Sequence, residues 1–233
     1  MIGLLLFLFF IPTFATETPQ VSTSIPYQEI KLKNNDTLLG LFGKNWELVA
    51  RFNRMDEKHL IGGHKLKVPN DLEALKNWTP MPREYPPAAS HKKYFLILLD
   101  EQFLGTYEYG KLILDMPISS GRPPERCDAP NGDCSTPKGL FQALGGDWNH
   151  TSTLYDDPSG NPYPMKWAIR FHINKDWVQY WIHGGDLPGY QASHGCIRVI
   201  PKDALKLFRW VFPKAPKREF WLKKGTGIPI EIK

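Results

Sequence analysis

Hydrophobic and polar positions divide the chain into two patterns that a proline-rich stretch separates. In the first, residues 27–32 alternate well enough for a short strand, and apolar residues then recur at helical spacing. From Tyr94 onward the apolar runs are short and bounded by turn residues, which is typical of strands. The pattern therefore predicts a small α+β domain followed by a mainly β domain with one or two helices.

The small domain is expected over residues 25–70. Asp36 is the predicted N-cap of a helix that begins at Thr37, and Asn53 is positioned to end a second helix. A closing strand is predicted at residues 66–69. The order strand, helix, helix, strand thus fits into about 45 residues.

The larger domain is expected over residues 91–233, after a linker at residues 71–90. Four prolines in the linker exclude a helix and predict an extended connector. The best helix candidate is Lys202–Val211, opened by Pro201, with Leu205, Phe208 and Val211 on one face. Strands are predicted at residues 94–99, 103–109, 112–119, 177–183 and 228–232.

The start of the chain predicts export. Residues 1–15 are uncharged and mostly apolar, and the apolar run of about ten residues is too short for a hydrocarbon layer of about 30 Å. They resemble a signal peptide cut after Ala15, and a retained anchor is the alternative. A short polar segment, residues 16–24, follows, so a periplasmic or cell-envelope location is expected.

Charge and cysteine content narrow the possible partners and the possible roles of the three cysteines. The net charge is +5, and a basic surface would suit an anionic envelope polymer. The basic residues are spread along the chain rather than clustered, which disfavours a nucleic-acid partner. Cys127 and Cys134 flank a six-residue loop and predict a disulfide, although two free thiols or a redox pair are alternatives. Cys196 remains as the odd thiol.

Cys196 lies in residues 181–198, where candidate catalytic side chains are densest. A cysteine nucleophile needs a thiolate, which a nearby imidazole and positive charge would favour. His183 ends a predicted strand, and Gly195 would let a substrate carbonyl approach the backbone amides. The alternatives are zinc ligation by His183, His194 and Cys196, with no evident fourth ligand, or an inert buried cysteine.

The string ASHGCIRV after IHGG resembles the signature of L,D-transpeptidases. The resemblance implies an L,D-transpeptidase-like β-sandwich with Cys196 as nucleophile and His183 as catalytic histidine, without metal or cofactor. The resemblance also implies that the motif residues around the nucleophile support it and stabilise the oxyanion; these are Ser193, His194, Gly195 and Arg198. Substrate binding is implied for Tyr163, Met165, Gly184 and Gly185. Two departures are a spacing of only ten residues from His183 to Ser193, and Gly184 where some members carry serine.

The implied function is that of a transferase in peptidoglycan synthesis, cell-wall organisation and cell shape, and of a carbapenem target. Cys196 would form an acyl-enzyme on a stem tetrapeptide, release D-alanine and pass the acyl group to an amine. The acceptor would be a second stem, giving a 3→3 cross-link, or an outer-membrane lipoprotein. An L,D-carboxypeptidase and a non-catalytic wall-binding protein are alternatives, whereas a sortase-like enzyme has its histidine much farther upstream of its cysteine.

The first domain resembles a LysM peptidoglycan-binding module. The resemblance rests on Asp36-Thr37-Leu38, on Asn53, and on Gly62-Gly63 before the closing strand. It implies binding of the amino-sugar glycan. The alternative is a small α+β domain whose apolar residues only form its core.

Overall fold

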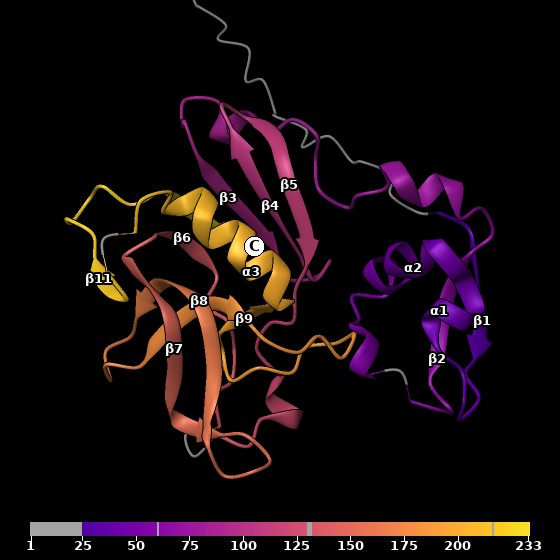
Figure 1. Ribbon diagram of the computed structural model, residues 1–233. Coiled ribbons are helices and arrows are strands. Elements are labelled where there is room, and N and C mark those ends of the chain that lie inside the picture. The colour runs from indigo at the N-terminus through magenta and orange to yellow at the C-terminus, as the bar shows by residue number, and fades with distance from the viewer. Residues whose placement is uncertain (1–24, 60, 130–131, 216) are drawn as a thin grey trace, which may run out of the picture.

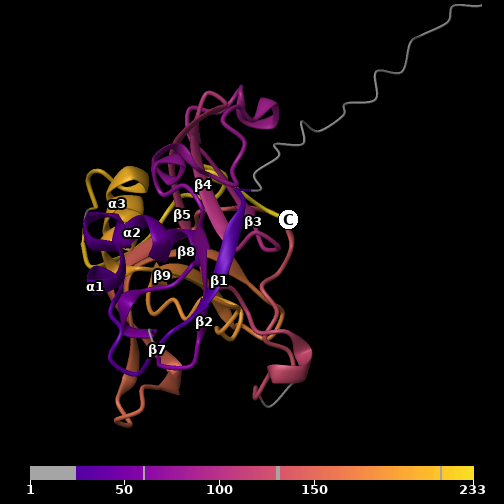
Figure 2. The ribbon, with the colours of Figure 1, turned by 90° about the vertical axis from the view of Figure 1, so that its right-hand side faces the viewer.

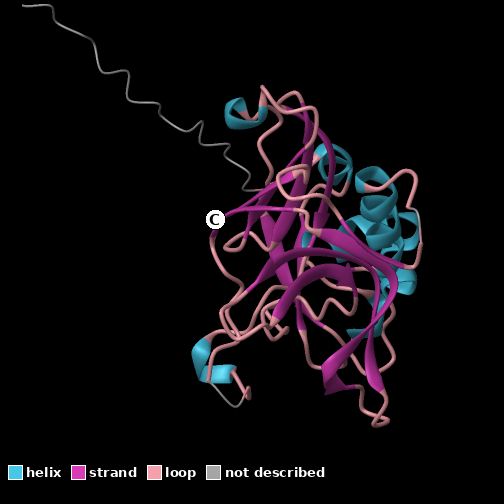
Figure 3. Ribbon diagram, turned by 90° about the vertical axis from the view of Figure 1, so that its left-hand side faces the viewer, coloured by secondary structure: helices cyan, strands magenta, loops and turns pink. Residues whose placement is uncertain are grey.

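The computed structural model describes residues 25–59, 61–129, 132–215 and 217–233. The predicted signal peptide and the polar segment that follows it lie outside the described residues. Figure 1 shows the N-terminal region beside a larger part in which strands predominate, and Figure 3 shows the same predominance by colour. Among the described residues, no helix combines the length and the apolar character that a membrane crossing requires.

The N-terminal region is a two-stranded antiparallel sheet with short helices between its strands. Its elements are β1 (Tyr27–Lys31), α1 (Leu38–Phe42), η1 (Gly43–Asn45), α2 (Trp46–Phe52), η2 (Glu57–His59) and β2 (Lys65–Pro69). Strand β1 runs antiparallel to β2, with Tyr27 opposite Pro69, and Figure 2 shows the two strands side by side. This is the expected order of a small α+β unit.

Three polar residues shape this unit. The N-cap of α1 is Thr37, whose side chain accepts a hydrogen bond from the Gly40 amide, so the prediction that Asp36 caps this helix was wrong. Asp36 instead accepts a hydrogen bond from the Lys33 amide and closes the preceding turn. At the end of α2, Asn53 bonds the backbone of Lys67 through both polar atoms of its side chain, 2.8 and 2.9 Å away, which joins the helix end to β2.

The proline-rich segment is packed rather than extended. It contains the 3₁₀ helices η3 (Glu73–Asn77) and η4 (Pro86–Ala88). Met81 and Ala88 are fully buried in a cluster with residues of the adjoining sheet. Proline is tolerated in the first turn of a helix, where its missing N–H has no intrahelical partner. Burial of the Met81 and Ala88 side chains stabilises the packed conformation over the extended one.

The larger part contains two five-stranded sheets. The first has the strand order β5 (Lys111–Pro117), β4 (Phe103–Glu108), β3 (Tyr94–Leu98), β12 (Pro229–Ile232) and β6 (Gly139–Gln142). The second has the order β10 (Ile197–Val199), β9 (Gln179–Gly184), β8 (Pro162–Ile173), β7 (Gly145–Asp156) and β11 (Glu219–Trp221). Another 3₁₀ turn, η5 (Pro124–Arg126), lies in the loop before β6. The mainly β prediction is confirmed.

Helix α3 (Pro201–Val211) shares the main hydrophobic core with both sheets. It packs mainly on β8 and β9, as Figure 1 also shows. Its buried apolar residues are Ala204, Leu207, Phe208 and Val211. Leu205 is only half-buried. The buried face of the helix therefore includes the predicted Phe208 and Val211, but has Ala204 and Leu207 in place of Leu205.

The sequence pattern did not predict the long hairpin of β7 and β8. Its burial along both strands is irregular, and the register shifts between Thr151 and Asp156, which removes the strict alternation that marks a strand. The predicted strand at 177–183 begins only at Gln179, because Trp177 has φ 63° and lies in the preceding turn.

Candidate functional site

The parallel pair β9 and β10 brings His183 and Cys196 to one cavity. Ile197 lies opposite Ile182, so Cys196, one residue before β10, lies next to Trp181. The cavity has a volume of about 560 Å³, and both His183 and Cys196 line it. Two residues that are 13 positions apart in the sequence therefore meet because their strands are neighbours in the sheet.

His183 is held in a defined orientation. The residue is 2% exposed, and its Nδ1 lies 2.9 Å from the Gly184 carbonyl oxygen. A carbonyl can only accept, so Nδ1 carries the proton and Nε2 keeps a free electron pair. Gly184 has no side chain to offer the imidazole, and its backbone carbonyl supplies this support instead.

Burial keeps both groups neutral. It lowers the pKa of His183 to about 3 against the opposing effect of the Gly184 hydrogen bond, and Arg198 lowers it further. Burial also raises the pKa of the Cys196 thiol to about 11, opposed by a hydrogen bond from the Trp181 backbone and by Arg198. The free protein therefore holds a neutral imidazole and a neutral thiol, and the prediction that nearby positive charge favours a thiolate is not met in this state.

The residues before Cys196 form a tightly bonded turn. The Ser193 hydroxyl accepts a hydrogen bond from the Gly195 amide at 3.1 Å and donates one to the Cys196 carbonyl. Gly195 has φ 109°, and a Cβ there would lie 2.6 Å from the Tyr180 ring. Thr136 donates a hydrogen bond to the Gly195 carbonyl at 2.9 Å. Both the backbone conformation and the close ring require glycine at position 195.

His194 and Arg198 flank the thiol but point to different partners. Nε2 of His194 is 2.6 Å from the Asp128 carboxylate, and its ring stacks on Tyr155 with centroids 3.9 Å apart. The Arg198 guanidinium lies over the Tyr163 ring, 5.1 Å from its centroid. Neither has the buried position of His183, which suits a supporting role.

The predicted substrate-binding residues divide into two groups. Tyr163 and Met165 line the cavity. Gly184 and Gly185 are not among the described residues that line it, and neighbouring atoms crowd both positions. A Cβ at Gly184 would lie 3.2 Å from the Lys166 carbonyl oxygen, and one at Gly185 would lie 3.2 Å from the Arg198 side chain. Close packing accounts for these two glycines.

Apart from Tyr163 and Met165, the sequence did not indicate the part of the cavity wall that β7 and β8 contribute. It includes side chains of His150, Tyr155 and Arg170. The Arg170 guanidinium is sandwiched between Trp181 and Trp221, 4.2 and 3.7 Å from their ring centroids. The sequence contains no local motif that marks these residues as a group, because they become neighbours only through strand pairing.

The loop between His183 and Ser193 contacts the N-terminal region. Asp56 accepts a hydrogen bond from the Leu187 amide at 2.7 Å, and the Asp56 amide donates to the Leu187 carbonyl at 2.8 Å. Met55 forms an isolated bridge with Pro188, and Lys58 forms an ion pair with Asp186. The N-terminal region therefore supports the loop that follows the predicted catalytic histidine.

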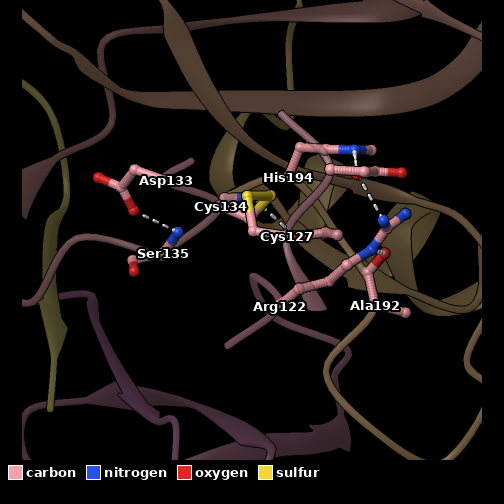
Figure 4. The surroundings of a disulfide bond; sticks show 10 residues. Arg122, Cys127, Asp133, Cys134, Ser135, Ala192 and His194 are labelled. Atoms are coloured by element: carbon pink, nitrogen blue, oxygen red, sulfur yellow. Dashed lines mark hydrogen bonds and ion pairs between the residues drawn. A yellow bond between two sulfur atoms is a disulfide. The ribbon is translucent and has the colours of Figure 1, made fainter. Parts of the chain in front are cut away.

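Cys127 and Cys134 form a disulfide with Cα atoms 5.5 Å apart. Figure 4 shows it beside Arg122 and His194. In the part of the chain that the structure describes, the one group with metal-ligand spacing is Asp128, Cys134 and His194. The sulfur of Cys134 is bonded to Cys127 and cannot serve as a thiolate. The predicted zinc alternative of His183, His194 and Cys196 forms no such group among these residues.

Residues 92–231, more than half of the chain, match the YkuD family, the L,D-transpeptidase catalytic domain. The chain belongs to the L,D-transpeptidase family. Members of this family are cell-wall enzymes that act on peptidoglycan stem peptides. The match does not include residues 25–70, so the LysM resemblance stays a prediction.

Solved structures of L,D-transpeptidases are among those that this chain matches. One from Xylanimonas cellulosilytica is 22% identical with a TM-score of 0.50, over 88% of this chain and 98% of that one. One from Stackebrandtia nassauensis is 16% identical with a TM-score of 0.45, over 82% of this chain and 67% of that one. Mycobacterium tuberculosis L,D-transpeptidase 1 is 21% identical with a TM-score of 0.40, over 61% of each chain. This L,D-transpeptidase family member thus spans about three fifths of the mycobacterial protein. No curated protein matches the sequence.

Proposed function

We propose that this protein is a peptidoglycan L,D-transpeptidase in which Cys196 is the nucleophile and His183 the general base. The observation that carries the proposal is that both side chains line one cavity while the Gly184 carbonyl fixes the His183 tautomer. In this reading Cys196 attacks the carbonyl of the third residue of a stem tetrapeptide, and D-alanine leaves.

The protonation states support general-base catalysis. With a thiol pKa of about 11, only about one Cys196 in ten thousand is a thiolate at pH 7. The proton therefore leaves Sγ as the C–S bond forms, and Nε2 of His183 accepts it. The resulting imidazolium then protonates the departing amine of D-alanine.

The second half-reaction returns the enzyme to its neutral state. An acceptor amine attacks the thioester, His183 takes its proton, and Cys196 leaves as a thiol. With a second stem as acceptor the product is a 3→3 cross-link, and with an outer-membrane lipoprotein it is an anchor. With water the enzyme acts as an L,D-carboxypeptidase. A wall-binding protein without catalysis is the remaining alternative.

The donor half-reaction is tested with a disaccharide tetrapeptide. Cys196→Ala and His183→Gln are expected to abolish or strongly reduce D-alanine release. His172→Gln is the matched control, because this histidine packs on Phe141 and Tyr180 and is not among the described residues that line the cavity. Release that persists in Cys196→Ala would refute the assignment.

The acceptor is tested by mass spectrometry of the products. A disaccharide tetrapeptide offered alone gives a 3→3 dimer if a stem is the acceptor and a tripeptide if water is. Addition of a peptide carrying the free lysine amine of a lipoprotein C-terminus gives a mixed product only if the enzyme accepts that amine.

The remaining parts of the protein are proposed to bring the enzyme to its substrate. Residues 1–15 would direct export to the periplasm or cell envelope, and residues 25–70 would bind the glycan as a LysM-like module. Support for the module is the β1, α1, α2, β2 order of its elements. The Cys196→Ala protein should sediment with glycan strands from which stem peptides have been removed, and failure to do so contradicts the LysM assignment.

A further inference from the structure

The disulfide holds a carboxylate against the residues that precede Cys196. Asp128 follows Cys127 directly, and its Oδ1 lies 2.6 Å from both His194 Nε2 and Arg122 Nη1. Arg122 also contacts the residues that precede Cys196 directly, since its Nε donates a hydrogen bond to the Ala192 carbonyl at 3.0 Å. Figure 4 shows Arg122, Ala192 and His194 together beside the two sulfur atoms.

The other end of the disulfide supports the same turn. Cys134 leads directly into Ser135 and Thr136, and Thr136 bonds the Gly195 carbonyl. Thr136 also accepts a hydrogen bond from the Gly121 amide at 2.9 Å. Residues on both sides of the crosslink therefore contact positions 194 and 195, immediately before the thiol.

We propose that Asp128 is a positioning residue for the Cys196 turn, and that the Cys127–Cys134 disulfide must be intact to hold it there. The inference rests on the proposed function, because it concerns the rate at which Cys196 is acylated. It adds a redox requirement at a second pair of cysteines, separate from the state of the nucleophile.

The exposure of Asp128 explains why a covalent link is needed. Its side chain is 65% exposed, so water competes for its hydrogen bonds. A carboxylate on a loose loop would spend little time against His194, whereas the crosslink limits the positions that its backbone can reach. Consistent with a close contact, Arg122 first and His194 second lower the pKa of Asp128 to about 2.

Reduction is a two-electron step with a named co-reactant. A water-soluble phosphine and one water molecule convert the disulfide to two thiols, and the phosphine becomes its oxide. A phosphine is preferred to a thiol reductant, because a thiol could also attack the acyl-enzyme thioester and be mistaken for an acceptor.

The experiment measures D-alanine release by the oxidised protein, the phosphine-reduced protein, Asp128→Asn and the double variant Cys127→Ser/Cys134→Ser. Loss of positioning should lower kcat by about 10- to 100-fold while KM changes less than threefold. Reduction should add little to the defect of Asp128→Asn, because both changes remove the same contact. Asp133→Asn is the matched control, since Asp133 lies in the same loop and bonds the Ser135 amide. It should keep wild-type kcat and wild-type sensitivity to reduction.

The proposal is overturned if the reduced protein, with both thiols verified, keeps its oxidised kcat. It is also overturned if the losses from reduction and from Asp128→Asn multiply. Thermal unfolding of each form shows whether the fold survives, and Asp128→Asn together with the phosphine arm suffices if the double variant does not fold.

A readout without catalysis separates this inference from the proposed function. In the Cys196→Ala background, NMR titration of His194 should show a lower pKa in Asp128→Asn and after reduction, because the Asp128 hydrogen bond raises the pKa of His194 against its burial. An unchanged titration refutes the positioning role. If no form releases D-alanine but the titration shifts, the proposed function fails and the contact stands.

Discussion

The neutral state of His183 makes a specific prediction about stability at low pH. The pKa of His183 is about 3 in the folded protein, against about 6.5 in an unfolded chain. Between these values the unfolded chain binds the additional proton. Stability from this residue is therefore complete above about pH 6.5 and is lost progressively as the pH falls toward 3.

The magnitude follows from the two pKa values. At pH 5 the linkage relation gives a loss of about 2 kcal/mol relative to neutral pH, because the unfolded histidine is mostly protonated and the folded one is not. This is a large fraction of the 5–15 kcal/mol that is usual for a domain.

Urea unfolding at pH 7 and pH 5 measures the effect in the wild-type protein and in His183→Gln. The glutamine variant should lose about 2 kcal/mol less than the wild type over this interval, since other titrating groups are common to both proteins. Cys196→Ala keeps His183 and should behave as the wild type. Equal losses in the wild type and His183→Gln would refute the neutral, desolvated imidazole.

Three further predictions test other parts of the site. Alkylation of Cys196 in the free protein should keep accelerating up to about pH 11, and an inflection below pH 6 would instead indicate a preformed thiolate and imidazolium pair. Gly195→Ala should destabilise the protein by about 2–5 kcal/mol in denaturant titrations, because its φ is 109° and the Tyr180 ring lies too close, and an effect below 1 kcal/mol would argue against this geometry. Asp56→Ala leaves the buried Leu187 without its side-chain acceptor and should cost about 1–3 kcal/mol by the same measurement, whereas an unchanged unfolding midpoint would mean that the N-terminal region does not support this loop.

The family assignment depended on residues that are close together in the sequence. His183, Ser193 and Cys196 form a short pattern that can be read without a structure, and residues 92–231 match the family as the pattern implied. The same is true of the end of α2 at Asn53 and of the strand boundaries around β3 and β4. Local backbone preferences and local spacing carry this information, so it can be read from a short stretch such as the 14 residues from His183 to Cys196.

The tertiary structure alone decided how the site is supported. His194 meets Asp128 from 66 positions away, and Leu187 meets Asp56 from 131 positions away. The same holds for the protonation states, because burial of His183 and Cys196 depends on which strands cover them. Spacing along the chain cannot report such contacts, since strand register and the packing of one region on another bring distant residues together.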